Sequence, residues 1–170
     1  MQKGSNKKIG VFLGRLQPQH KGHEIMIRRI FRENDEVILC IGSAQKIKKS
    51  DPIFEKNPLS CEERMKRLET FLKNEGFYKP YKIVPITDVE PDSAWPLHLK
   101  NNCHLMDKTI NTVYFGDFIP DDYKKGLEAV DLLVKFIKRR KFTYKTKKNV
   151  FHKISSATEI RTLEKNREDL

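Results

Sequence analysis

The stretch IGVFLGRLQPQHKGH, from Ile9 to His23, decides the fold of this chain. The run from Ile9 to Leu13 is apolar apart from one glycine, which is typical of a buried strand. Apolar residues then recur at helical spacing from Ile25 to Phe31, so the two histidines lie where a strand gives way to a helix. Parallel α/β proteins bind phosphates at this place, because backbone N–H groups and the positive end of the helix point outward there.

Apolar strands alternate with amphipathic helices along the first two thirds of the chain, a pattern typical of a parallel sheet. Ser60, with Glu63 three residues later, forms a capping box that marks one helix start. We expect an α/β fold, a Rossmann-like parallel sheet flanked by helices, in a single domain over residues 1–170. The predicted strands are 9–13, 36–42, 82–86, 112–115 and 132–136, and the predicted helices are 22–33, 61–74, 94–101, 122–129 and 158–166.

The composition indicates a soluble, folded, cytoplasmic protein. The chain has 170 residues, of which 38% are hydrophobic and 34% are charged. No apolar run approaches the roughly 20 residues of a membrane span, and the polar stretch from Met1 to Lys8 lacks the apolar core of a secretory signal. The three cysteines show no paired spacing, which favours reduced thiols, and Cys40 is expected to be a small core residue.

Positive charge is concentrated near the end of the chain. The formal net charge is +11, and no acidic residue occurs from Leu132 to Thr158. Such a stretch either attracts an anion, which is a nucleotide phosphate or a nucleic acid, or forms a solvated basic face.

Arg15, His20 and His23 are the first group of candidate site residues. Imidazoles near a helix start can donate hydrogen bonds to phosphoryl oxygens, and an arginine directly after a strand can clamp a phosphate. A glycine between the histidines, Gly22, would let a ligand approach the backbone. The alternatives are a pair of surface histidines or a zinc pair, although no cysteine or aspartate is placed to complete a zinc site.

Further polar groups follow the other predicted strands. Ser156, Thr158 and Arg161 open the last predicted helix, where capping alone would also explain the hydroxyl groups. Trp95 lies in a polar, proline-flanked loop and either packs in the core or stacks on a flat ring. Because the carboxyl ends of parallel strands meet at one edge, all these groups are expected to converge on one crevice. The others are Asp88, Glu90 and Asp92 after the third strand, and Gly116 and Asp117 after the fourth.

These motifs resemble those of the nucleotidylyltransferase superfamily. His20-Lys21-Gly22-His23 matches its H-x-G-H motif, and the stretch from Ser156 to Arg161 is similar to its second motif. Within the superfamily the chain resembles archaeal-type nicotinamide-nucleotide adenylyltransferases. It departs from them at Gln19, where an aromatic residue is common, and at Ala157, where glycine or serine is usual. The resembling segments are 14–18, 41–45, 57–64 and 85–100.

The resemblance implies a nucleotidylyltransferase fold and a reaction in which ATP and nicotinamide mononucleotide give NAD and pyrophosphate. It implies that magnesium is bound through the ATP phosphates, with no metal ligand from the protein. The implied catalytic residues are His20, His23, Arg15 and Arg161. The implied ATP-binding set adds Gly14, Gly116, Asp117, Ser156 and Thr158, and the implied mononucleotide-binding set is Lys56, Asp88, Val89, Asp92 and Trp95.

Relatives of this kind imply assembly into a homo-oligomer. Other transfers of the superfamily stay open, with nicotinate mononucleotide, phosphopantetheine, a flavin nucleotide or a cytidylyl acceptor as the substrate. A non-catalytic RNA-binding module is the alternative outside enzymes. For an enzyme, we expect nucleic-acid binding to be weak and non-specific, and we expect no association with membranes.

Overall fold

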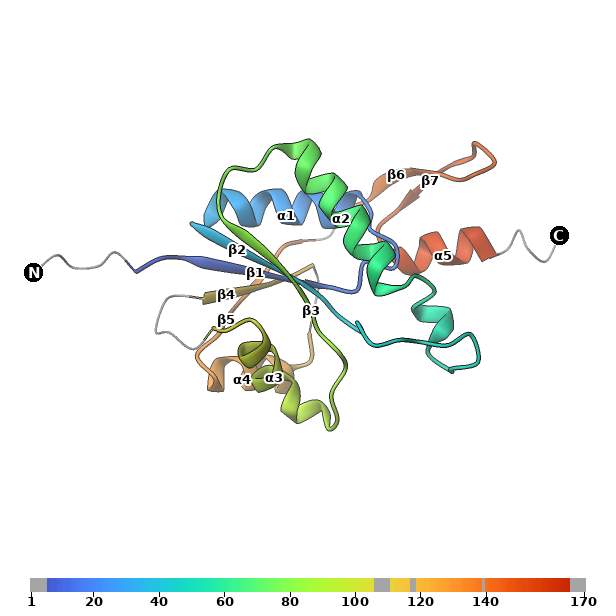
Figure 1. The fold of residues 1–170 in the computed structure, drawn as a ribbon. Coiled ribbons are helices and arrows are strands. Elements are labelled where there is room, and N and C mark those ends of the chain that lie inside the picture. The colour runs from blue at the N-terminus through green and yellow to red at the C-terminus, as the bar shows by residue number, and fades with distance from the viewer. Residues whose placement is uncertain (1–5, 106–110, 117–118, 139, 166–170) are drawn as a thin grey trace, which may run out of the picture.

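A five-stranded parallel sheet forms the centre of the molecule (Figure 1). The computed structural model describes residues 6–105, 111–116, 119–138 and 140–165. The order of the strands across the sheet is β3-β2-β1-β4-β5, so the direction of winding reverses between β1 and β4. Ligands bind at such a switch point in open α/β sheets. The strands are β1 (Ile9–Gly14), β2 (Glu36–Ile41), β3 (Tyr81–Pro85), β4 (Asn111–Phe115) and β5 (Leu133–Phe136).

Helices cover both faces of the sheet (Figure 1). On one face lie α1 (Lys21–Glu33) and α2 (Cys61–Glu75), and on the other lie α3 (Trp95–Asn102) and α4 (Asp121–Ala129). A last helix, α5 (Ala157–Lys165), lies beyond the carboxyl ends of the strands. Two short 3-10 helices, η1 (Phe54–Lys56) and η2 (Asp92–Ala94), lie in the loops after β2 and β3. No helix in these ranges is both long and apolar enough to span a bilayer.

Alternate residues of the strands build two core layers, because successive side chains of a strand point to opposite faces. Phe12 packs with Ile27 and Leu68 on the side of α1 and α2. Its neighbour Val11 packs with Leu99 and Leu127 on the side of α3 and α4. All six side chains are fully buried, so the apolar run of β1 anchors helices on both faces.

The predicted fold class is confirmed. Every predicted strand and helix is present, and each bound lies within one residue of the prediction; the last residue of the predicted helix 158–166 lies outside the described ranges. The capping box of α2 is also confirmed, since Ser60 Oγ accepts from the Glu63 N–H and the Glu63 carboxylate accepts from the Ser60 N–H. Cys40 is buried in the core as predicted, and its Sγ lies 3.0 Å from that of Cys103.

The sequence analysis missed a β-hairpin in the basic stretch. Strands β6 (Phe142–Lys145) and β7 (Phe151–Ile154) pair antiparallel, with Phe142 opposite Ile154. The turn between them places Asn149 at φ 63°, a left-handed conformation that asparagine tolerates well. Alternating aromatic residues on both sides of an asparagine were the available signal, and the surrounding lysines obscured it.

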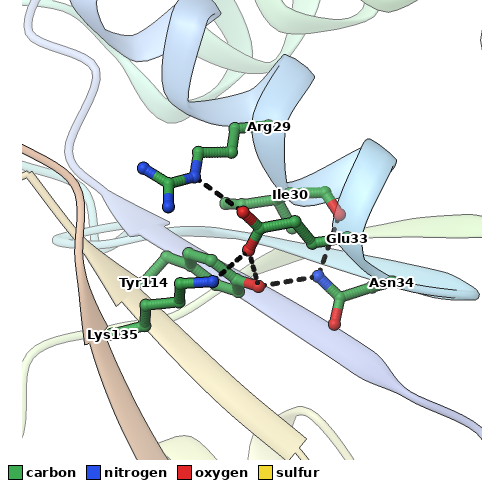
Figure 2. Close-up of polar contacts among 6 residues, drawn as sticks. All are labelled: Arg29, Ile30, Glu33, Asn34, Tyr114 and Lys135. Atoms are coloured by element: carbon green, nitrogen blue, oxygen red, sulfur yellow. Dashed lines mark hydrogen bonds and ion pairs between the residues drawn. The ribbon is translucent and has the colours of Figure 1, made fainter.

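A polar cluster ties α1 to the two strands β4 and β5 (Figure 2). The Glu33 carboxylate accepts hydrogen bonds from Arg29 Nε at 2.7 Å, from the Tyr114 hydroxyl at 2.9 Å and from Lys135 Nζ. Asn34 Nδ2 donates to the same Tyr114 hydroxyl at 3.0 Å. Burial alone would raise the pKa of Glu33, but the hydrogen bonds from Arg29, Lys135 and Tyr114 outweigh it and lower the pKa to about 2.

This depressed pKa predicts a loss of stability in acid. The carboxyl group ordinarily titrates near 4.5, so its ionised form stabilises the fold above that pH, and the contribution is lost as the pH falls from about 4.5 to about 2. Glu33→Gln should lower the free energy of unfolding at pH 7 by roughly 1–2 kcal/mol, a figure that allows for solvent screening of a partly exposed group.

Urea unfolding of wild type and variant at several pH values checks this prediction. The difference between the two proteins should shrink as the pH falls through the stated window. Glu128→Gln is the matched control, because the Glu128 carboxylate is exposed and lies as far as 4.0 Å from Lys124 Nζ. An equal loss of stability in both variants would contradict a special role for Glu33.

Candidate active site

A cavity of about 650 Å³ opens at the carboxyl ends of β1 and β4, where the sheet topology reverses. Its wall is formed by the loop after β1, the first turns of α1, the segments after β4 and β5, and the start of α5. The predicted convergence of all the polar groups on one crevice is therefore confirmed for the two motifs, whereas the groups after β3 lie outside the described lining of this cavity. The sequence-predicted residues that line the cavity are Gly14, Arg15, His20, His23, Gly116, Ser156, Thr158 and Arg161.

The two histidines form the start of α1. His20 is the N-cap residue, and its Nδ1 accepts a hydrogen bond of 3.0 Å from the Gly22 N–H. In return, Nδ1 of His23 accepts from the His20 N–H at 3.3 Å. In the neutral form of each ring the proton is therefore on Nε2. A contact from these rings to an anion has to be made by Nε2–H, because Nδ1 is used within the helix start.

The His20 ring is held between two other rings. It stacks on His23 with centroids 3.8 Å apart and on Phe142 of β6 with centroids 4.9 Å apart. This packing gives Gly22 a second role. A Cβ at Gly22 would lie 2.8 Å from the His20 ring, so the missing side chain makes room for that imidazole. Gly22 also lines the cavity, and the close approach of a ligand to its backbone stays a prediction.

The start of α5 supplies the other side of the cavity. Ser156 Oγ accepts from the Glu159 N–H at 3.3 Å, which confirms that this hydroxyl caps the helix. Arg161 Nη2 donates to Thr158 Oγ1 at 3.1 Å, and Nη1 donates to the carbonyl of Gln17 in the loop after β1. The guanidinium thereby joins the second motif to the first.

The cavity is strongly electropositive. None of its described lining residues is acidic. Burial lowers the pKa of Arg161, and the positive charge of Arg15 lowers it further. Two helix N-termini also lie at this cavity, where the positive ends of their dipoles favour an anion. An arrangement of this kind binds a multiply charged anion such as a polyphosphate.

The residues expected to bind the mononucleotide form no part of this cavity's described lining. They lie after β2 and β3, on the other side of the loop that follows β1. Asp88 accepts from Ser43 Oγ at 2.9 Å and from Gln45 Nε2 at 2.6 Å. Lys56 is exposed at the end of η1. Asp117 lies outside the described ranges, and the roles expected for Lys56, Asp88, Val89, Asp92 and Trp95 stay predictions.

Trp95 packs against the core cluster on the α3 and α4 side and lies 5.6 Å from the Tyr123 ring, centroid to centroid. Its side chain is only partly buried. Burial and then the nearby Asp92 raise the pKa of the Tyr123 phenol, which places Asp92 in the same group. Trp95 thus packs against the core, and its exposed part can still stack on a flat ring, so this position is compatible with both of the predicted roles.

Sequence reasoning missed several residues of the site. Arg29 and Arg32 line the cavity from the exposed side of α1, where helical spacing from His23 was the available signal. Two basic residues after β5, Lys138 and Arg140, also line it, so part of the basic stretch belongs to the site.

Phe142 was missed together with its hairpin. Buried Gln17 was missed too: its amide exchanges two 2.9 Å hydrogen bonds with the backbone of Leu59.

A parallel sheet with a basic cavity at its switch point defines a protein of the α/β class, in which ligands bind at this place. The chain belongs to the cytidylyltransferase-like family, whose model matches residues 11–163. This match confirms the resemblance to the nucleotidylyltransferase superfamily that the two motifs predict.

Curated relatives are nicotinamide-nucleotide adenylyltransferases. The one from Pyrococcus horikoshii is 42% identical over 86 residues, which are 51% of this chain and 44% of that protein. The one from Methanococcus aeolicus is 33% identical over 121 residues, which are 70% of this chain and 64% of that protein. The chain thus spans about half to two thirds of the length of these relatives.

The fold is similar to that of a solved structure, a bifunctional NMN adenylyltransferase/ADP ribose pyrophosphatase from Francisella tularensis complexed with AMP and a manganese ion. The TM-score is 0.70 at 24% sequence identity, and the match covers 95% of this chain and 42% of that chain. This likeness confirms the fold.

The stack on His20 predicts that the hairpin depends on Phe142. Removing a buried phenylalanine side chain costs about 3–5 kcal/mol, and Phe142 belongs to a small cluster with Ile154 and Ile160. Phe142→Ala should speed amide hydrogen exchange in residues 142–154 at least tenfold while β1 to β4 exchange as before. Mass spectrometry of the exchanged peptides measures this.

Phe151→Ala is the matched control on the same hairpin, because that ring is 65% exposed. It should leave the exchange rates close to those of the wild type. Equal acceleration in both variants would show that Phe142 does not anchor the hairpin to the site.

Proposed function

We propose that this chain transfers the AMP moiety of ATP to nicotinamide mononucleotide, giving NAD and pyrophosphate. The observation that carries the proposal is the meeting of two helix N-termini, with Arg15 and Arg161 between them, at the switch point of the sheet. Membership of the family and the names of the curated relatives support this choice of reaction.

The chemistry needs no protein nucleophile. An oxygen of the mononucleotide 5′-phosphate attacks the α-phosphorus of ATP, the bond from that phosphorus to the bridging oxygen breaks, and pyrophosphate leaves with the electron pair. The protein's part is to position the two phosphates and to stabilise the growing negative charge. Nε2–H of His20 and of His23 would donate to the ATP phosphates, and Arg15 and Arg161 would neutralise them.

The start of α5 would hold the β- and γ-phosphates through Ser156 and Thr158, with Gly14 and Gly116 allowing close approach of the nucleotide. The mononucleotide would lie toward Lys56, Asp88, Val89, Asp92 and Trp95, which flank the other side of the loop after β1. Asp117 remains an expected contact of ATP.

Magnesium is proposed to arrive with ATP, bound to its phosphates. Across residues 6–105, 111–116, 119–138 and 140–165, no three or more His, Cys, Asp or Glu side chains are grouped so as to hold a metal ion. The described cavity wall offers cationic and neutral donors instead. Bound magnesium would offset charge on the leaving pyrophosphate.

The proposal covers residues 1–170 as one nucleotidylyltransferase domain. Its cytoplasmic location is supported by the composition and by the lack of paired spacing among its three cysteines. Its assembly into a homo-oligomer is supported by the resemblance alone, and light scattering tests the assembly.

Release of pyrophosphate from ATP with each candidate acceptor tests the function. We expect release with nicotinamide mononucleotide in the presence of magnesium, NAD as the product, and no release after chelation by EDTA. Faster turnover with nicotinate mononucleotide, phosphopantetheine, a flavin nucleotide or, with CTP, a phosphoalcohol would reassign the substrate. Tight RNA binding with no turnover on any acceptor would refute the proposal that this protein is an enzyme.

His20 caps α1 through Nδ1 and is proposed to bind ATP through Nε2–H, so a substitution that keeps the cap should separate the two roles. Asparagine is a good N-cap residue, so His20→Asn should keep the cap while removing the imidazole and its stacking on His23 and Phe142. Turnover should fall by about two to three orders of magnitude, the scale for losing a preorganised donor. His20→Ala should lose similar turnover and, in addition, about 1 kcal/mol of stability.

Steady-state assays and thermal unfolding of both variants check this prediction. Turnover close to the wild-type value in folded His20→Asn would remove His20 from the mechanism.

Trp95 is predicted to act on the mononucleotide alone. Stacking a base on an aromatic ring is worth about 1–3 kcal/mol, so Trp95→Ala should raise the KM for the mononucleotide about tenfold or more and leave that for ATP nearly unchanged. Trp95→Phe should be milder. Because the chain has one tryptophan, its fluorescence should also change when the mononucleotide binds. Equal effects on both substrates would indicate that Trp95 acts through the core.

A further inference from the structure

Arg64 is a buried arginine that no step of the proposed reaction uses. It lies in the first turns of α2 and is 1% exposed. Its guanidinium donates to four groups, all of them backbone carbonyls: Nη1 to Arg15 at 2.8 Å and to Gly42 at 2.7 Å, Nη2 to Ser43 at 2.9 Å, and Nε to Ser60 at 3.2 Å. One side chain thus bonds the loop after β1 and the loop after β2 at once.

The carbonyls that it holds precede two unusual residues. Leu16 follows Arg15 with φ 54°, and Ser43 follows Gly42 with φ 49°. A left-handed conformation is disfavoured for a side chain such as leucine and persists only when the surroundings impose it. Arg64 Nη1 accordingly bonds the peptide group directly before each of these two residues.

Each of the two loops leads to a different substrate. The side chain of Arg15 lines the polyphosphate cavity. In the other loop, Ser43 Oγ donates to both carboxylate oxygens of Asp88, at 2.9 and 3.1 Å, and Asp88 belongs to the expected mononucleotide side. Arg64 therefore links Arg15 to Asp88 through a continuous series of contacts.

A buried guanidinium is costly unless its N–H groups are satisfied. Burial lowers the pKa of Arg64, and repulsion from Arg15 lowers it further, whereas the negative charge of Asp88 acts in the opposite direction. An apolar side chain would fill the same space without this cost. What only the planar guanidinium supplies is several donors in a fixed geometry, directed at two loops.

We propose that Arg64 is the positioning residue of the site, which fixes the ATP-binding loop and the mononucleotide-binding loop relative to each other. The proposal rests on the proposed function, because it assigns the two loops to the two substrates. Arg64 touches neither substrate and acts through Arg15 and Ser43. Its loss should therefore change the alignment of the two phosphates more than the binding of either substrate alone.

The test compares Arg64→Met and Arg64→Lys with the wild type by kcat, both KM values, thermal unfolding and the Kd for ATP from calorimetry. A misplacement of about 1 Å can cost about 100-fold in rate. We expect kcat to fall about 100-fold in Arg64→Met, while each KM and the Kd for ATP change less than fivefold. Arg64→Lys should recover only part of the loss, because an ammonium group cannot hold both loops.

Arg67→Met is the matched control, since Arg67 lies on the same helix, one turn further, and is exposed. It should behave as the wild type. A kcat within twofold of wild type in folded Arg64→Met would overturn the proposal. So would a loss of turnover that equals the loss of folded protein. If Arg64→Met fails to fold, the same criteria apply to Arg64→Lys.

A double-mutant cycle tests the route through Ser43. Arg64→Lys combined with Ser43→Ala should lose less activity than the product of the two single losses, because both changes disrupt one series of contacts. Independent effects would overturn this route. The proposed function is tested separately, by turnover of the wild type with nicotinamide mononucleotide. The role of Arg64 is tested by the ratio of the variant's kcat to that of the wild type, measured with whichever acceptor the wild type uses.

Discussion

The loop after β1 is the constraint on which the rest of the site depends. Its Gln17 carbonyl accepts from Arg161 of α5, and the Gln17 amide is bonded to the backbone of Leu59. The same loop presents the carbonyl of Arg15 to Arg64 of α2. Segments from the beginning, the middle and the end of the described chain are thus joined at one point. Two helix starts can face the same cavity only because this loop holds both.

The positive charges at the site repel one another and thereby lower the stability of the folded protein. Arg15 and Arg161 are close enough for the charge of one to lower the pKa of the other. The Glu33 carboxylate offsets part of this excess, because it accepts hydrogen bonds from Lys135 and from Arg29, which lines the cavity. A bound polyphosphate would relieve the remaining repulsion, so substrate binding should stabilise the fold as well as begin the reaction.

The sequence was sufficient for the sheet, its helices and the place where the two motifs meet, because these depend on local periodicity and on motifs at strand ends. It was not sufficient for features that depend on distant contacts. The hairpin was missed because its two four-residue strands lie among lysines. The packing of the His20 ring beside Gly22 was missed because Phe142, far along the chain, stacks on that ring. Nothing local in α2 indicates that Arg64 would bond carbonyls of two other loops.

A crystal structure with magnesium, a non-hydrolysable ATP analogue and nicotinamide mononucleotide tests the central claim most directly. The account predicts that the triphosphate lies between the first turns of α1 and α5, in contact with Arg15 and Arg161, and that the mononucleotide lies on the Asp88 side of the loop after β1. A triphosphate bound elsewhere on the protein, or an empty cavity at saturating analogue, would contradict it.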